Sequence, residues 1–341
     1  MLRLNDFDYA LPPELIAQEP LARRDESRLL VVRRDRQEFA HRRFNEIMEY
    51  LVPGDLLVMN ETKVLPVRLY GRKRTGGRVE VLLLRAVSSD TWEALVRPGR
   101  RVAPGTRLEF GNGLLEGEVI GRTEAGGRVI RFRYAGEFEE VLRRVGEVPL
   151  PPYIKRKLAS PERYQTVYAK EPGSAAAPTA GLHFTPELLA TLRERGVEMA
   201  SLVLHIGLDT FRPVRVEDVT AHRMHREDFG IPEEAAEAVN RARSEGRRVI
   251  AVGTTVVRCL EAAADKRGRV AETAGSTDLF IYPGYSFRVV DVLLTNFHLP
   301  RSTLLMLVAA FAGTEKILRA YREAVRLRYR FFSFGDAMLI L

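Results

Sequence analysis

The chain has 341 residues, of which 45% are hydrophobic and 29% charged, and its formal net charge is +8 at pH 7. This composition is ordinary for a soluble globular protein, and the length allows two domains. No long uncharged apolar run is present, which excludes a transmembrane helix, and no apolar core of a secretory signal follows Met1. The single cysteine, Cys259, excludes an intramolecular disulfide and a cysteine-rich metal site. We therefore expect a cytoplasmic enzyme or binding protein.

The excess of basic residues bears on the class of partner. Most of the 53 basic residues are arginine, whose guanidinium forms bidentate contacts with phosphate. A basic balance favours a polyanionic partner such as RNA. Genome composition explains the same bias equally well, so charge alone leaves RNA binding open.

The first 65 residues predict the beginning of an α/β domain. Residues 27–32 form an apolar run bounded by charges, as in a strand, and residues 44–51 have the apolar spacing of a helix. Residues 55–60 predict a second, buried strand. It ends in the polar cluster 60–63, at the kind of strand end where open α/β sheets collect ligands. Lys63 of this cluster is a candidate RNA contact.

Residues 66–150 change character and predict an inserted all-β domain. Glycine-containing turns separate short β-prone segments, at residues 79–86, 91–96, 106–110, 115–120 and 128–134. This spacing indicates a small barrel or sandwich. The host would be a discontinuous α/β domain made of residues 1–65 and 151–341. Such a barrel either binds RNA or serves as a rigid structural module.

Helices and strands alternate in residues 151–341. We expect strands at residues 199–206, 248–252 and 289–295, and helices from Pro186 to Gly196 and at residues 232–245, 256–264 and 302–312. The alternation predicts a largely parallel sheet covered by helices.

The stretch 178–186 places Thr179, Gly181 and His183 just before a helix that Thr185 can cap. Free N–H groups and the helix dipole favour a negative charge there. On the local pattern alone, an ordinary loop with a buried histidine is the commoner explanation.

Two further turns connect a strand to a helix. Gly253-Thr254-Thr255 suits an anionic ligand, with Arg258 one turn later, although ordinary helix capping explains the same residues. Asn296 and His298 follow the next strand, and a hydrogen-bonded structural histidine is the alternative there. If the two strands are neighbours, these turns predict one crevice at the carboxyl edge of the sheet.

Other polar residues allow several interpretations. Asp278 lies beside an apolar run, and Ser333 and Asp336 follow aromatic residues that belong either to the core or to a base-stacking platform. His222 and His225 would share a face of a helix, where metal binding competes with proton transfer, phosphate contact or a core role. The remaining candidate RNA contacts are Lys155, Arg156, Arg223 and His225.

Long ordered motifs place the chain near a known family. It resembles the S-adenosylmethionine:tRNA ribosyltransferase-isomerases of queuosine biosynthesis through the stretches 25–29, 60–66, 178–185, 252–258, 295–304 and 329–338. Two positions depart from the family pattern: Asp209 stands where glycine is usual, and Glu61 where aspartate is usual. The departures weaken any specific role for those two positions.

The resemblance implies a fold and a reaction. The fold is a three-layer α/β/α domain interrupted by a small β-barrel. The ribosyl part of S-adenosylmethionine, the co-substrate, is transferred to 7-aminomethyl-7-deazaguanine at the wobble position of tRNA and isomerised to epoxyqueuosine, with release of adenine and methionine. No metal is required, and we expect a monomer.

The chemistry of this reaction assigns candidate roles. Deprotonating the carbon beside the sulfonium needs a base, and adenine departure favours an acid. We expect His183, His298 and Asp278 to be catalytic, and the substrate to be bound by Thr179, Gly181, Gly253, Thr254, Thr255, Arg258, Asn296, Ser333 and Asp336. The alternatives are another S-adenosylmethionine-dependent tRNA-modifying enzyme, such as a methyltransferase, and a non-catalytic RNA-binding protein. The glycine-rich loop expected of a methyltransferase is absent from the sequence.

Overall fold

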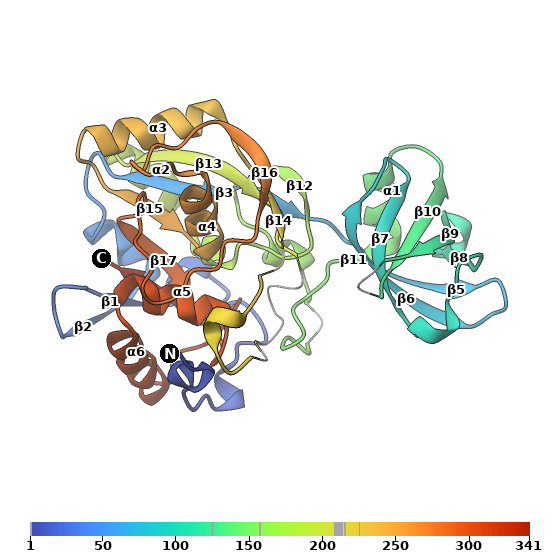
Figure 1. Ribbon diagram of the computed structural model, residues 1–341, viewed down its shortest axis with the longest axis horizontal. Coiled ribbons are helices and arrows are strands. Elements are labelled where there is room, and N and C mark those ends of the chain that lie inside the picture. The colour runs from blue at the N-terminus through green and yellow to red at the C-terminus, as the bar shows by residue number, and fades with distance from the viewer. Residues whose placement is uncertain (1, 124–125, 157, 208–213, 215, 225) are drawn as a thin grey trace. The chain divides into compact units, whose positions relative to one another are not determined.

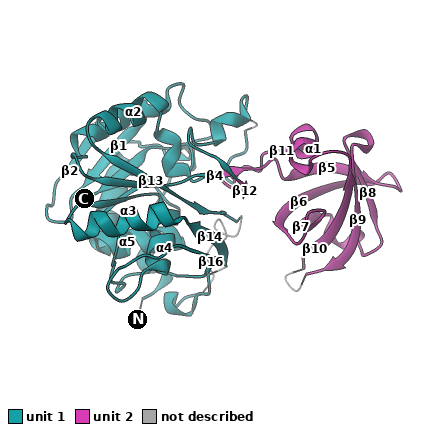
Figure 2. Cartoon of the chain, turned by 90° about the horizontal axis from the view of Figure 1, so that it is seen from above, with its two compact units in different colours: residues 1–62, 152–171, 177–341 teal, residues 63–151, 172–176 magenta. Residues whose placement is uncertain are grey.

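The structure is a computed structural model that describes residues 2–123, 126–156, 158–207, 214, 216–224 and 226–341. The chain forms two compact units, which Figure 2 colours separately. The larger unit contains Met1–Thr62, Pro152–Glu171 and Ala177–Leu341, and the smaller contains Lys63–Pro151 and Pro172–Ala176. No helix in the described ranges is both long enough and apolar enough to cross a bilayer.

A mixed nine-stranded sheet is the scaffold of the larger unit (Figure 1). In spatial order its strands are β16 (Thr273–Thr277), β14 (Glu227–Ile231), β13 (Glu198–Leu204), β3 (Leu56–Asn60), β15 (Val249–Val252), β17 (Val292–Asn296), β18 (Ala337–Ile340), β1 (Arg28–Val32) and β2 (Phe39–Arg43). Strands β13, β3, β15 and β17 are parallel, as are β18 and β1. The other four pairings are antiparallel.

The expectation of a largely parallel sheet therefore holds for the four adjacent strands β13, β3, β15 and β17 and for the pair β18 and β1, and it is wrong for the four antiparallel pairings. Strands β14 and β16 have the sequences Glu-Asp-Phe-Gly-Ile and Thr-Ala-Gly-Ser-Thr. Neither shows the apolar run or the strict alternation that marks a strand in a sequence. Pairing in the folded sheet, and not local propensity, makes them strands.

Helices cover both faces of the sheet. Leu188, Leu189 and Leu192 of α2 (Pro186–Glu194) share one core cluster with alternate strand residues such as Leu57 and Ile250. Helices α3 (Glu233–Ser244) and α4 (Thr254–Ala263) contact β13 and β15 but contribute nothing to that cluster, so they cover the opposite face. Two more helices, α5 (Thr303–Ala312) and α6 (Thr314–Arg326), pack against each other. The three-layer α/β/α arrangement is confirmed.

The smaller unit is a closed antiparallel barrel. Its strands are β5 (Arg68–Lys73), β6 (Arg78–Ala86), β7 (Thr91–Arg97), β10 (Arg128–Tyr134), β9 (Leu115–Arg122) and β8 (Arg107–Phe110), and pairing of β5 with β8 closes the ring. Inward residues such as Leu69, Val81 and Ile130 are fully buried. The unit also contains α1 (Phe138–Val145) and the short strand β11 (Gly146–Glu147). The inserted all-β barrel is confirmed, and β5 and α1 are additions that the sequence pattern did not reveal.

Some local expectations need correction. Residues 44–51 were expected to be an α-helix, but Phe44–Glu49 form a 3-10 helix. Two short strands, β4 (Thr62–Val64) and β12 (Glu171–Ser174), pair as a separate two-stranded sheet. This pairing joins segments far apart in sequence, and hydrophobic spacing cannot reveal such a pairing.

Candidate active site

A pocket of about 310 Å³ lies at the sheet edge where β15 and β17 end. These strands are parallel neighbours, so the turns that follow Val252 and Asn296 lie together. The lining comes from residues 177–180, 253–255, 295–302 and 332–333, together with Tyr153, Ile206 and Leu304. The expected crevice is therefore present, and it contains Gly253, Asn296 and His298.

The turn at residues 178–183 supplies one wall through Pro178, Thr179 and Ala180. Residues Thr179–His183 form a single 3-10 turn, and Thr185 caps α2 by accepting from the Leu188 N–H at 3.1 Å. Gly181 does not line the pocket. A Cβ at Gly181 would lie 1.9 Å from the Tyr168 hydroxyl, so packing and not ligand contact requires glycine there.

Asn296 links the strand end to this turn. The Thr179 hydroxyl donates to Asn296 Oδ1 at 2.9 Å. Asn296 Nδ2 lies 3.1 Å from His183 Nε2 and donates to the Phe332 carbonyl at 3.3 Å. Because the carbonyl can only accept, the amide orientation is fixed. All the polar atoms of this buried side chain are used in shaping the pocket wall.

The same bonds fix the state of His183. Its Nε2 accepts from Asn296, so the proton of the neutral ring is on Nδ1, which lies 2.7 Å from Ser27 Oγ. The ring stacks on Phe44 and is buried. Burial, reinforced by the charges of Arg24 and Arg330, lowers the pKa of His183 to about 3. His183 lies behind the pocket wall with both ring nitrogens engaged, and it does not face the pocket as the sequence led us to expect.

His298 does line the pocket. Its Nε2 lies 2.8 Å from Thr295 Oγ1, and its backbone N–H donates to the Tyr321 hydroxyl at 3.0 Å. Among the described residues, Nδ1 has no hydrogen-bond partner. Burial lowers the pKa of this histidine to about 3, so the ring is neutral near pH 7. A neutral imidazole with one free nitrogen can accept or deliver a proton within the pocket.

The amino end of α4 forms another part of the pocket lining. Gly253 has a φ of +94°, a conformation that favours glycine, and it begins the helix without a side-chain cap. Thr254 and Thr255 line the pocket and are more than 90% buried. Within the described ranges, the Thr255 hydroxyl has no hydrogen-bond partner. Free N–H groups, the helix dipole and this hydroxyl together suit a carboxylate.

An aromatic surface completes the pocket. The rings of Tyr153 and Phe332 lie 4.7 Å apart at 30°, and the Tyr153 hydroxyl lies 2.7 Å from Ser333 Oγ. Phe332 has a φ of +69°, in the left-handed region, and it lines the pocket together with Ser333. A flat apolar surface beside a hydroxyl suits a nucleobase. Tyr153 was not predicted to belong to the site, because the proline-rich connector in which it lies has no periodic pattern of apolar residues.

Arg258, predicted to bind substrate, and Asp278, predicted to be catalytic, have partners within the protein. Arg258 is buried in an ion pair with Glu227 of β14, and its Nε donates to the Leu279 carbonyl at 3.1 Å. Asp278 is exposed and lies 3.8 Å from Arg226. Neither residue lines the pocket. The sequence around an arginine does not show whether the carboxylate that it binds belongs to a ligand or to a residue of a distant strand.

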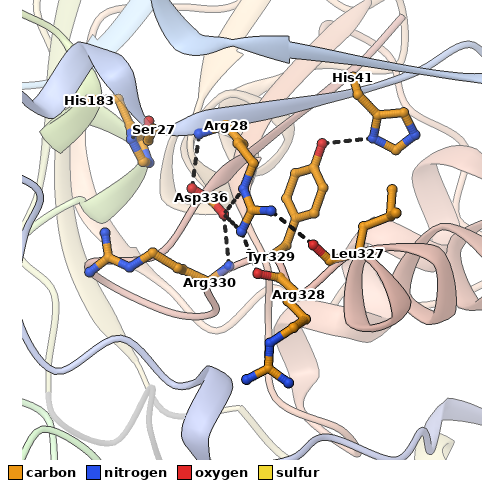
Figure 3. A network of polar contacts seen from close by, with 9 residues as sticks. All are labelled: Ser27, Arg28, His41, His183, Leu327, Arg328, Tyr329, Arg330 and Asp336. Atoms are coloured by element: carbon orange, nitrogen blue, oxygen red, sulfur yellow. Dashed lines mark hydrogen bonds and ion pairs between the residues drawn. The ribbon is translucent and has the colours of Figure 1, made fainter.

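Asp336 is likewise a structural residue (Figure 3). Its carboxylate accepts from the backbone N–H groups of Arg28 at 2.9 Å and Arg330 at 2.7 Å, and from Arg28 Nε at 3.0 Å. It is 1% exposed and does not line the pocket. These bonds connect β1 to β18, which are parallel neighbours. The expectation that Asp336 binds substrate is therefore not supported by its position.

The candidate RNA contacts are surface residues. Lys63, Lys155, Arg156 and Arg223 are exposed, and Arg156 lies 3.5 Å from Glu19. His225, one of this group, and Asp209 lie outside the described residues. His222 lies in a loop before β14 with its ring against Phe280, and residues 222–224 and 226 are not helical. Glu61, the other departure from the family pattern, lies 3.5 Å from Lys170.

The two buried histidines predict a pH-dependent stability. Each has a pKa lowered from 6.5 to about 3, so the unfolded chain binds protons that the folded chain excludes. Stability should be complete above about pH 6.5 and fall toward pH 3, by up to about 1.4 kcal/mol per pH unit for each histidine. Urea unfolding between pH 7.5 and 5 measures this slope. The variant His298→Gln should show a smaller slope than the wild type, and an unchanged slope would contradict neutral burial.

Comparison with known proteins identifies the family. The family described as "Queuosine biosynthesis protein" matches residues 4–340. A protein of Carboxydothermus hydrogenoformans named S-adenosylmethionine:tRNA ribosyltransferase-isomerase is 62% identical over 340 residues, covering 100% of both chains. A protein of the same name from Clostridioides difficile is 55% identical over 99% of this chain and 100% of its own.

A solved structure agrees. The crystal structure of S-adenosylmethionine tRNA ribosyltransferase from Thermotoga maritima shares 44% sequence identity and has a TM-score of 0.57. The match covers 98% of this chain and 100% of the Thermotoga chain. The chain belongs to the family of queuosine biosynthesis proteins.

Proposed function

We propose that this protein is an S-adenosylmethionine:tRNA ribosyltransferase-isomerase and that the pocket at the ends of β15 and β17 binds S-adenosylmethionine. The pocket carries the proposal because it combines three features in one cavity: a helix amino end with an unpartnered hydroxyl, an aromatic surface and a histidine with a free nitrogen. Its volume is in the usual range for small-molecule sites. The names of the full-length relatives supply the reaction.

The reaction transfers the ribosyl part of S-adenosylmethionine to the modified base of the tRNA. The aminomethyl nitrogen of 7-aminomethyl-7-deazaguanine in tRNA forms a bond to the ribosyl part of S-adenosylmethionine. Rearrangement of that part gives the epoxycyclopentanediol of epoxyqueuosine, and adenine and methionine leave. The carbon beside the sulfonium loses a proton, the departing adenine gains one, and the attacking amine must be neutral.

The pocket offers a group for each end of the co-substrate. The amino end of α4, with Gly253, Thr254 and Thr255, receives the methionine carboxylate. The Tyr153 and Phe332 rings receive the adenine. His298 then lies in the pocket with Nδ1 free to move a proton. His183 acts through Asn296 and positions the wall, since both of its nitrogens are bonded to protein groups.

The variant Thr255→Val tests the carboxylate end. It removes the unpartnered hydroxyl and keeps the shape of the side chain, so we expect the KM for S-adenosylmethionine to rise about tenfold, as for loss of one hydrogen bond to a charged group. The KM for tRNA should stay the same. Thr191→Val on α2, where the hydroxyl bonds only its own helix, is the matched control. An unchanged KM for S-adenosylmethionine in Thr255→Val would place the carboxylate elsewhere.

Product analysis tests the function itself. The protein is incubated with labelled S-adenosylmethionine and tRNA carrying 7-aminomethyl-7-deazaguanine, with tRNA that lacks this base as the control. Ribosyl transfer gives adenine and methionine, and only with the modified tRNA. Formation of S-adenosylhomocysteine would identify a methyltransferase, and binding without any product would identify an RNA-binding protein.

A further inference from the structure

A second, smaller cavity lies behind the pocket wall and is rich in arginine. Arg24, Arg163 and Arg330 line it together with Ser27, His183 and Ser333. We call it the arginine pocket. Ser333 also lines the substrate pocket, so the two cavities share a wall residue. Figure 3 shows Arg330 extending from the Asp336 network on the side where Ser27 and His183 lie.

None of the three guanidinium groups forms an ion pair with a carboxylate among the residues described. Their hydrogen bonds go to main-chain carbonyls: Arg24 to Gln165 at 3.2 Å, Arg163 to Leu21 at 2.6 Å and Arg330 to Glu19. Burial lowers the pKa of Arg330, and the nearby charges of Asp336 and Glu19 only partly oppose this effect. Arg163 Nε and Arg330 Nη1 are buried without any partner. Buried donors and charges of this kind are costly unless they are paired.

Other partly or fully buried arginines of the same unit are neutralised. Arg28 pairs with Asp336, Arg248 with Asp55 and Arg258 with Glu227. The contrast shows that the fold supplies counter-charges where an arginine has a structural role. In the arginine pocket, burial lowers the pKa of Arg24, and the positive charge of Arg163 lowers it further. The charges of Arg24 and Arg330 also reach His183 and lower its pKa.

We infer that a phosphodiester of the RNA substrate binds across the mouth of the arginine pocket, next to the nucleotide that enters the substrate pocket. The cavity itself has a volume of about 20 Å³, the room of one water molecule, so the phosphate lies against its rim and not inside it. Guanidinium groups bind phosphate oxygens through paired donors, and these three guanidinium groups make their side-chain hydrogen bonds to neutral carbonyls and not to carboxylates. Arg24 and Arg163 also line a wider cavity of about 420 Å³, with Arg23, Asp25 and Glu187 on its walls, which gives an extended strand a route to the surface. This inference rests on the proposed function, because it takes tRNA to be the ligand.

The variant Arg24→Gln provides the sharpest test, since the Arg24 side chain makes one hydrogen bond to the described part of the protein, to the Gln165 carbonyl. We expect the Kd for tRNA to rise about tenfold, as for loss of a bond to a charged group. The slope of log Kd against log salt should fall by about 0.7, the value for one phosphate contact of a single strand. The KM for S-adenosylmethionine should not change. Arg330→Gln should behave in the same way, and Arg24→Lys should restore part of the affinity.

The control removes the same charge elsewhere. Arg267 is exposed and lies beyond the carboxyl end of α4, whose amino end faces the substrate pocket. Arg267→Gln should leave both the affinity and the salt slope as in the wild type. Thermal unfolding of each variant reports whether it is folded. Phosphate-ethylation interference on tRNA bound to the wild-type protein gives the same information without any substitution: ethylation beside the wobble nucleotide should abolish binding.

Several outcomes would overturn the inference. An unchanged salt slope in folded Arg24→Gln and Arg330→Gln would do so, as would ethylation that has no effect beside the wobble nucleotide. A raised KM for S-adenosylmethionine with unchanged tRNA affinity would assign the pocket to the methionine carboxylate instead. These results are distinct from failure of the proposed function, in which the wild-type protein would release no adenine from S-adenosylmethionine in the presence of modified tRNA.

Discussion

Replacing His298 by alanine is expected to lower kcat by roughly 10²–10⁴-fold, the usual contribution of a positioned acid or base. His298 lines the pocket, and its Nδ1 has no hydrogen-bond partner among the described residues. Its lowered pKa, about 3, keeps the ring neutral, so the free enzyme should show no loss of kcat/KM with an apparent pKa near 6.5 from this residue. Steady-state kinetics between pH 5.5 and 8.5 would measure both effects.

The control for His298→Ala is His41→Ala. His41 is partly exposed on β2, bonds the Tyr329 hydroxyl at 2.8 Å and does not line the pocket. It should retain turnover close to that of the wild type. His183→Ala should also reduce turnover, but with the pH profile unchanged, because His183 acts by positioning Asn296. Near-normal kcat in a folded His298→Ala variant, with only a raised KM for S-adenosylmethionine, would restrict His298 to binding.

Replacing Asp336 by alanine is expected to lower the free energy of unfolding by about 3 kcal/mol, near the lower end of the cost of removing one partner of a buried ion pair. The carboxylate accepts two backbone N–H groups and the Arg28 guanidinium, and all lose their acceptor. The cost is at the lower end because the Arg28 side chain is 37% exposed and regains water. Urea unfolding at pH 7.5 would measure the change.

Two companion variants make this result specific. Asp336→Asn keeps the shape but offers one acceptor in place of two, so it should lose part of the stability. Asp35→Ala removes an exposed carboxylate, 72% accessible and 3.8 Å from Arg36, and should change stability by well under about 1 kcal/mol. If folded Asp336→Ala kept wild-type stability and instead lost affinity for substrate, the original expectation that Asp336 binds substrate would be restored.

Predictions from periodic patterns succeeded where the pattern is local. The strand Leu56–Asn60 is an unbroken apolar run, and the helix Thr303–Ala312 begins at the Ser302 cap. The glycine-punctuated segments of the barrel were equally readable. The edge strand β16, Thr273–Thr277, was missed because Thr-Ala-Gly-Ser-Thr has no apolar face. Its strand state depends on pairing with β14.

The candidate site divides in the same way. Gly253 and the two threonines after it were predictable, because a strand, a glycine and a helix in succession place free N–H groups at the sheet edge. Tyr153 was not, since it reaches the pocket from a distant connector without a regular pattern. Arg258 and Asp336 are residue types that often bind ligands, but each forms an ion pair with a residue of a remote strand. Arg258 pairs with Glu227, and Asp336 pairs with Arg28.

The sequence by itself determined the family, the α/β class with an inserted barrel, and the strand ends at which the site lies. It could do so because motifs, apolar periodicity and turn residues act over a few neighbouring positions. Only the tertiary structure decided which polar groups are free and which are satisfied. His183 is bonded at both nitrogens, whereas His298 keeps one free. That difference depends on which distant side chains meet inside the core. Burial lowers the pKa of both histidines to about 3, so the hydrogen bonds decide the chemistry left for each ring to perform.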